Sequence, residues 1–347
     1  MINLPEDEPH APPAQPGNDA DEDASRPVSD SRHPSAQEPL ILAEASPVDA
    51  IPPGRVEAEP AVTEQLLFQS YLQAPARRPA RIPHFGHLLL LTLLIGVSFG
   101  ILVFFLGLIS YFHVFGWRLT TKSATNLDVN LVGEVVLYLA TLGFCLFVFP
   151  LIWNEGYFTG LQWRADVARS RFAYLGGVAS GCFALAIVDQ VLMPGPSNAP
   201  IEKMISSPGA AWLMFAFGIT IAPFFEEMFF RGFLLPALAT AWDWIVEEAQ
   251  HRQPRPLDAN GHPQWSMPAM VAGSIATSIP FALLHFEQQG RSLGPFLLLI
   301  AISLILCAVR LQTRSLAAST LVHACYNFLI FSVELVVTGG FRHFDKM

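Results

Sequence analysis

Apolar positions gather in long runs, separated by short polar stretches, over most of the chain beyond residue 87. A helix needs roughly 20 mainly apolar residues to cross about 30 Å of hydrocarbon. The pattern therefore predicts an all-α fold, a polytopic integral membrane helical bundle. The predicted spans are 88–115, 131–153, 172–193, 209–240, 269–285, 294–309 and 315–338.

The fourth run, 209–240, is too long for one straight span. Pro223 lies inside it, and proline kinks or breaks a helix because it lacks an N–H and its ring clashes with the preceding turn. We therefore expect a kink or break near Ala222, and seven or eight spans in total. The segment 241–268 contains two Pro-containing stretches and Asp-Ala-Asn-Gly, which predict an exposed loop.

The chain before the first span differs in composition from the rest. Up to residue 76 it holds 14 acidic residues and three arginines, whereas the remainder holds 17 basic and 15 acidic residues. Such a Pro-rich, acidic stretch cannot bury enough apolar surface to offset its ordering entropy. We expect a disordered tail over 1–80 and a transmembrane helical domain over 85–338. Within the tail, 61–72 is a short, mildly amphipathic run that could lie against the membrane surface or form a transient helix. The acidic net charge of the chain comes from this tail and not from the rest of the protein. We expect no nucleic-acid partner.

The distribution of arginine predicts an orientation. Arg77, Arg78 and Arg81 directly precede the first span, so the positive-inside rule places the N-terminus in the cytoplasm, and the 154–171 loop with it. We expect no secretory signal peptide, because the first apolar run comes so late. The chain has 17 Arg against three Lys, which is typical of a GC-rich bacterial genome and indicates the inner membrane.

Three ionisable residues lie close together in the fourth run. A charged side chain within a span costs several kcal/mol unless it is paired or hydrated, so each is a candidate functional residue. Glu227 and Arg231 are i and i+4 on a helix and can form an ion pair. Glu226 points about 100° away and lacks that partner, which leaves it free to act as a general base or acid.

Later spans carry further polar residues. His285 ends the fifth run, and His323 and Asn327 share one face of the last. An imidazole beside an amide can donate hydrogen bonds to an oxyanion. Alternatively, Glu226, His285 and His323 could ligate a divalent metal such as zinc, or the histidines and Asn327 could simply cross-link helices.

The depths of the two histidines conflict in a strict seven-span arrangement. His285 lies near the end of its span, whereas His323 lies about a third of the way along another from the opposite side. If they act together, either a helix boundary differs from the prediction or the 209–240 run forms two elements.

Three motifs occur in order on these runs: EExxFRG (Glu226 to Gly232), FxxxH (Phe281 to His285) and HxxxN (His323 to Asn327). Together they resemble the CAAX-protease and bacteriocin-processing (CPBP, or Abi) family over 205–335. The resemblance implies that Glu226 activates a water molecule with help from His285. It implies that His323 and Asn327 stabilise the oxyanion, and that Glu227 and Arg231 support them.

The sequence therefore predicts an intramembrane endopeptidase that cleaves a membrane-associated or lipid-linked protein or peptide. Two other classes stay open. The chain could be a non-catalytic membrane scaffold or bacteriocin-immunity factor, or a transporter in which the intramembrane Glu and His residues relay protons. The absence of HExxH leaves a zincin-type zinc site unsupported.

Overall fold

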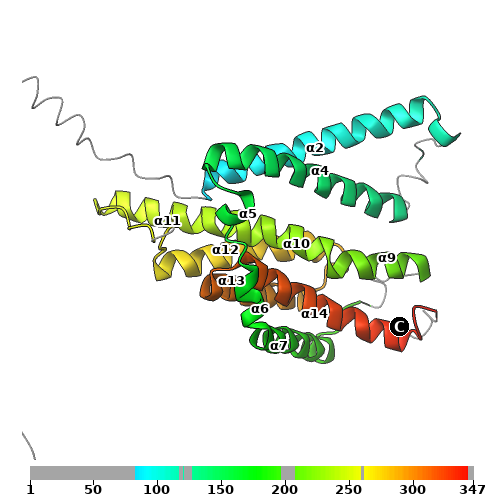
Figure 1. Cartoon of the computed structure of the whole chain (residues 1–347). Helices are drawn as coiled ribbons and strands as arrows, with labels where there is room; N and C mark the ends of the chain where they lie inside the picture. The colour runs from blue at the N-terminus through cyan, green and yellow to red at the C-terminus, as the bar shows by residue number, and fades with distance from the viewer. Residues whose placement is uncertain (1–82, 117–119, 121–126, 197–207, 259–261, 343–347) are drawn as a thin grey trace, which may run out of the picture. The chain divides into compact units, whose positions relative to one another are not determined.

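The computed structural model describes residues 83–116, 120, 127–196, 208–258 and 262–342. Over these residues the backbone is helical, with one isolated β-bridge between Leu257 and Pro263 and no sheet (Figure 1). The predicted all-α fold is confirmed. The predicted tail over 1–80, with its 61–72 segment, lies outside the described residues.

Seven helical segments of the described chain are long and apolar enough to cross a membrane, which resolves the predicted seven or eight. Short elements connect them: η1 (Val114–Gly116), α5 (Tyr157–Gly160) and α6 (Ala165–Ser170). The spanning segments are α2 (Phe85–Tyr111), α4 (Leu127–Trp153), α7 (Phe172–Leu192), the composite segment 208–249, α12 (Met267–Phe286), α13 (Leu293–Thr313) and α14 (Leu316–Val337).

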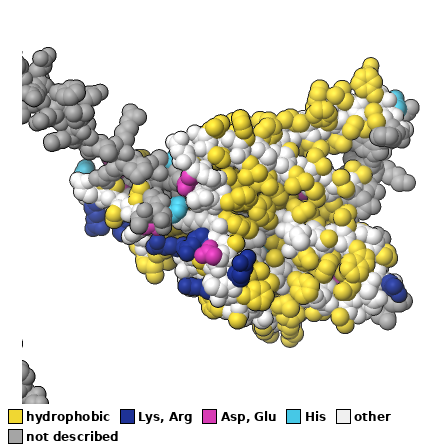
Figure 2. All heavy atoms as spheres, viewed as in Figure 1, with side chains coloured by type: hydrophobic (Ala, Val, Ile, Leu, Met, Phe, Trp, Pro, Cys, Tyr) yellow, Lys and Arg dark blue, Asp and Glu magenta, His cyan; other side chains and the backbone are white. Residues whose placement is uncertain are grey.

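The outer surface of the bundle is apolar. On α2, Leu89, Leu93 and Phe104 are each more than 60% exposed, and apolar side chains cover most of the face seen in Figure 2. Continuous apolar surface of this extent is typical of contact with lipid rather than with water. The chain is an integral membrane protein.

Two buried apolar clusters hold the helices together. One joins α2, α4 and α5 to the composite segment and includes Phe225, Met228 and Phe233. The other joins α7, α13 and α14 and includes Val322 and Tyr326. The polar motif residues Glu226, Glu227 and His323 follow or precede members of these clusters directly in sequence, so apolar packing on both sides fixes their backbone positions.

The composite segment consists of four pieces: α9 (Pro208–Ile219), α10 (Ile221–Glu227), the π-helical turn η2 (Met228–Leu234) and α11 (Leu235–Ala249). The helix is interrupted at Thr220, where φ is −125° and ψ is −72°. Pro223 then falls in the first turn of α10, where its missing N–H costs little. The break expected near Ala222 is confirmed two residues earlier.

The predicted loop over 241–268 is wrong for its first nine residues, which continue α11 to Ala249, and for its last two, which begin α12. Two polar residues of this stretch, Asp243 and Glu247, are buried on the face of α11 that meets the following chain. Asp243 accepts hydrogen bonds from the Ser266 amide (2.8 Å) and hydroxyl (2.5 Å), and Thr240 accepts one from the Trp265 indole (2.9 Å). The sequence pattern predicts that polar side chains in such a stretch are exposed to solvent, because their hydrogen-bond partners lie elsewhere in the chain.

The extension of α11 resolves the conflict in depth. Ser266, which caps α12, contacts Asp243, whereas Leu316 at the start of α14 packs beside Gly232, eleven residues earlier on the composite segment. At 1.5 Å per residue, α14 starts about 16 Å further along the bundle than α12, a stagger that Figure 1 also shows. His285 is 18 residues beyond Met267 and His323 is 7 beyond Leu316. These two offsets differ by eleven residues, which equals the stagger between the starts of α12 and α14. His285 and His323 therefore lie at the same depth in the bundle.

Candidate active site

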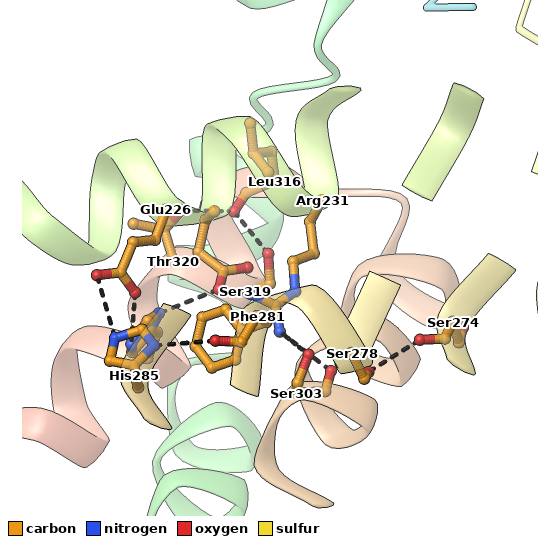
Figure 3. Close-up of polar contacts among 12 residues, drawn as sticks. Glu226, Arg231, Ser274, Ser278, Phe281, His285, Ser303, Leu316, Ser319 and Thr320 are labelled. Carbon is orange, nitrogen blue, oxygen red and sulfur yellow. Dashed lines mark hydrogen bonds and ion pairs between the residues drawn. The ribbon is translucent and has the colours of Figure 1, made fainter. Parts of the chain in front are cut away.

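Five of the six predicted site residues converge inside the bundle. Glu226 and Glu227 end α10, Arg231 lies in η2, His285 is in the last turn of α12 and His323 is on α14. A π-helical turn is rare and occurs often at functional sites. Figure 3 shows Glu226 directed towards His285, while Arg231 reaches past Phe281 to Ser303.

Glu227 and Arg231 form the ion pair that their spacing predicts. The Arg231 Nη1 lies 2.8 Å from the Glu227 Oε1, and both side chains are fully buried. The Arg231 Nη2 also donates to the hydroxyl (2.7 Å) and carbonyl (3.1 Å) oxygens of Ser303 on α13. A buried pair offsets its desolvation cost only when further hydrogen bonds satisfy it. Ser303 supplies them for the arginine.

The hydrogen bonds of both histidines determine their tautomers. The His323 Nδ1 lies 3.1 Å from the Glu227 Oε1, and the His285 Nδ1 lies 3.0 Å from the Phe281 carbonyl oxygen. Carboxylate and carbonyl oxygens accept but do not donate, so we assign the proton of each neutral ring to Nδ1. Each Nε2 is then an acceptor, and it donates only when the ring is protonated.

Both Nε2 atoms face the same carboxylate. The Glu226 Oε1 lies 3.8 Å from the His285 Nε2, and its Oε2 lies 3.7 Å from the His323 Nε2. The Glu226 and His285 side chains are 20% and 23% exposed, whereas that of His323 is 6% exposed. Glu226 and His285 are therefore the most accessible members of this group, and the His323 Nε2 meets Glu226 from a more buried position.

Asn327 makes its hydrogen bond to the backbone of another helix. Its side-chain Nδ2 donates to the Gly218 carbonyl oxygen at 2.8 Å, in the last turn of α9. The two N–H groups of an amide are separate donors, so one of them is engaged by this contact and the other can serve elsewhere. Asn327 therefore links α14 to α9 two residues before the break at Thr220.

Sequence reasoning assigned no role to Phe281, although it begins the FxxxH motif. Its ring lies 4.6 Å from the Arg231 guanidinium carbon, and its centroid is 5.0 Å from that of His285 and 6.0 Å from that of His323. A cation over an aromatic face is attracted by the ring quadrupole. Phe281 thus packs against the arginine and both histidines.

Two further contributors come from outside the motifs. Ser303 is a lone serine in an apolar span, and no pattern singles it out. On α4, Glu134 accepts a hydrogen bond from Tyr138 (2.8 Å), whose ring stacks on Phe225 with centroids 4.5 Å apart. Glu134 also interacts electrostatically with Glu226. An ionisable residue within a predicted span was the available signal for Glu134.

The predicted metal candidates have suitable donor atoms but not the required arrangement. A carboxylate and two imidazole Nε2 atoms, each with its Nδ1–H held by an oxygen, match the donor chemistry of a zinc site. Over the described part of the chain, however, no group of three or more His, Cys, Asp or Glu side chains is placed to hold a metal ion.

Comparison with known proteins agrees with the motifs. Residues 208–329 match the family model described as type II CAAX prenyl endopeptidase Rce1-like, a segment of 122 of the 347 residues that contains all six predicted site residues. The resemblance to the CPBP family is confirmed over this Rce1-like domain, and it supports a protease acting within the membrane. No curated protein and no solved structure gives a match.

Proposed function

We propose that the chain is an intramembrane endopeptidase that hydrolyses a peptide bond of a membrane-associated or lipid-linked protein or peptide. The observation that carries the proposal is the approach of two histidine Nε2 atoms to the partly exposed Glu226 carboxylate, in a bundle that is otherwise mainly apolar. We take 85–338 as the transmembrane domain and 205–335 as the catalytic core within it.

In the first step Glu226 acts as general base. A water molecule between Glu226 and His285 loses a proton to the carboxylate while its oxygen attacks the carbonyl carbon of the substrate. His285 positions this water, since its Nε2 accepts a hydrogen bond when the ring is neutral. General-base catalysis of this kind contributes about 10²–10⁴-fold.

The tetrahedral intermediate then needs a donor for its oxyanion. His323 supplies one from Nε2 when the ring is protonated, while the Glu227 carboxylate accepts the hydrogen bond from its Nδ1. The second N–H of Asn327 can add another donor. The intermediate collapses when the carbon–nitrogen bond breaks and Glu226 returns its proton to the leaving amine.

The Glu227–Arg231 pair positions His323 and does not itself take part in the reaction. It is fully buried and joins η2 to Ser303 on α13 and to His323 on α14. Because these contacts come from three helices, the pair holds the His323 ring in the orientation that the oxyanion step requires. We propose no direct contact of this pair with substrate.

We further propose that one end of the bundle faces the cytoplasm. We call it the arginine end: residues 154–171, 250–258, 262–266 and 310–316, which meet through contacts such as Ser315 to the Arg164 carbonyl (2.9 Å). The positive-inside rule assigns such an end to the cytoplasm. Among the described residues the opposite end carries Arg291 and Arg342, whereas the arginine end carries Arg164, Arg169, Arg171, Arg252, Arg255, Arg310 and Arg314.

The test compares wild type with Glu226→Gln, which keeps the size of the side chain but removes the base. Both proteins are purified in detergent, matched for thermal stability and incubated with a panel of membrane proteins and lipopeptides, with cleavage followed by mass spectrometry. Glu287→Gln is the control, because Glu287 lies two residues after His285 but is exposed and paired with Arg291. We expect the control to cleave like wild type and Glu226→Gln to lose at least about 100-fold.

Cleavage that survives Glu226→Gln would contradict the assignment of the base. A wild-type protein that cleaves only after zinc is added would contradict activation of water by Glu226 without a metal. A wild type inactive against the whole panel would favour the non-catalytic scaffold.

A further inference from the structure

A polar cavity of about 310 Å³ lies at the arginine end, away from the Glu226 site. Asp258, residues 262–265, the end of α13 and the chain before α6 line it. Its lining includes Gln162, Asp258, His262, Trp265, Arg310 and Arg314. None of these residues belongs to the three motifs or to the proposed reaction.

Arg310 is the unusual member of this lining. Its side chain is only 3% exposed, and the Nη2 donates a 3.3 Å hydrogen bond to the Leu161 carbonyl. The Nε is buried and has no hydrogen-bond partner in the described structure. No carboxylate of the described residues lies within 4.0 Å of the guanidinium. Arg310 also has a longer-range electrostatic interaction with Glu227, but that carboxylate already forms an ion pair with Arg231.

A buried guanidinium without a counter-charge is costly, since its desolvation is not offset by a partner. The second arginine of the cavity does not change this balance, because Arg314 is paired with Asp258 at 3.1 Å. The cavity therefore carries one unpaired positive charge, lined by side chains that can donate hydrogen bonds. An anion bound in the cavity would supply the missing counter-charge.

We propose that this cavity binds a phosphate group, through Arg310 and with Arg314 beside it. The planar fork of arginine matches the oxygens of a phosphate, and basic pockets between spanning helices at the cytoplasmic side are where lipid head groups bind. The cavity lies at the end of the spanning helix α13, and the ends of spanning helices are where lipid head groups are expected. The phosphate can come from an anionic lipid or from solution, and both sources present the same oxygens.

The test uses the full chain in detergent and follows thermal unfolding with three additions: phosphatidylglycerol, diacylglycerol with the same acyl chains, and inorganic phosphate. A ligand that binds only the folded state raises the Tm. We expect phosphatidylglycerol to raise it by about 2–4 °C and diacylglycerol, which lacks phosphate, to leave it unchanged. A rise with inorganic phosphate as large as that with the lipid would identify a soluble source.

Arg310→Gln removes the charge and is expected to abolish the rise, while the Tm without ligand stays equal to or above that of wild type. Arg169→Gln, at an exposed arginine of α6, is the matched control and should keep the full rise. Arg310→Lys retains a charge but not the fork and should keep part of it. Should Arg310→Gln fail to fold, Arg314→Gln, at a side chain 56% exposed, provides a second variant that should weaken the rise.

Equal shifts in wild type and Arg310→Gln would overturn the proposal, because they would assign the effect to general surface charge. So would equal shifts with phosphatidylglycerol and diacylglycerol, or no shift with either phosphate source. The readout is independent of proteolysis, so these outcomes are separate from the test of Glu226.

Discussion

The Asn327 side chain donates a 2.8 Å hydrogen bond to the Gly218 carbonyl, and this contact joins α14 to the last turn of α9. The final carbonyls of a helix have no partner within it. For Gly218 the partner is Asn327 on α14, and the helix breaks two residues later at Thr220. Because α10 follows this break and ends with Glu226 and Glu227, the contact also fixes the position of Glu226 relative to the histidines.

Asn327→Ala should therefore destabilise the folded protein as well as impair cleavage. Leaving a buried carbonyl without its donor costs about 1–3 kcal/mol. Asn327→Asp should cost more, because a carboxylate oxygen would then face the Gly218 carbonyl oxygen. Unfolding in detergent, followed by circular dichroism, measures both. Ser332→Ala, at an exposed position of the same helix, is the control, and an Asn327→Asp protein as stable as wild type would refute the account.

The Glu227–Arg231 pair should show strong coupling in a double-mutant cycle. Removing one partner leaves a fully buried charge uncompensated, so Glu227→Gln and Arg231→Met should each cost about 3–5 kcal/mol in unfolding free energy. The double variant should cost clearly less than the sum, because neither charge remains. Additive costs would mean that the pair is not the unit that the 2.8 Å contact indicates.

Two replacements of His323 should separate its structural and chemical parts. An asparagine amide can occupy the place of Nδ1 and donate to Glu227, but it does not reach the place of Nε2. An alanine side chain reaches neither place. We expect His323→Asn to unfold within about 1 kcal/mol of wild type and His323→Ala to lose about 1–3 kcal/mol. Both should lose cleavage, since neither offers a group at Nε2. Full activity in His323→Asn would show that Nε2 takes no part.

The start of α2 should loosen as the pH falls. The His84 Nδ1 accepts a hydrogen bond from the Gly86 amide (3.0 Å), and the His87 Nδ1 accepts one from the His84 amide (3.2 Å), so both rings must be unprotonated there. Burial lowers the pKa of His84 below its ordinary 6.5. A lowered histidine pKa gives stability that is fully present above pH 6.5 and is lost as the pH falls through the folded-state value.

Hydrogen exchange of the Gly86 amide between pH 7.5 and 5 measures this loosening, after correction for the intrinsic rate. Loss of an N-cap costs about 1 kcal/mol, or about fivefold in exchange. His84→Asn keeps a cap that does not titrate in this range and should remove the dependence. If the corrected exchange depends on pH equally in both proteins, His84 is not the group responsible.

Hydropathy located the spans to within a few residues at most ends, because lipid demands a continuous apolar run. It failed at the end of the composite segment. There Asp243 and Glu247 read as exposed loop residues, but they are buried against the following chain. Spacing along one helix placed Glu227 and Arg231 together, since an i, i+4 relation is local. It could not find Ser303, because that contact joins residues 72 positions apart.

What the sequence determined by itself was the membrane fold, the ion pair within one helix turn and the three motifs, all of which depend on local periodicity. Only the tertiary structure decided that His285 and His323 meet at Glu226, because the stagger of α12 and α14 depends on the length of α11 and on its packing. It also decided which histidine nitrogen carries the proton, which carbonyl Asn327 binds and which buried arginine of the described residues lacks an ion-pair partner. Each of these follows from contacts between helices, whose register no single helix encodes.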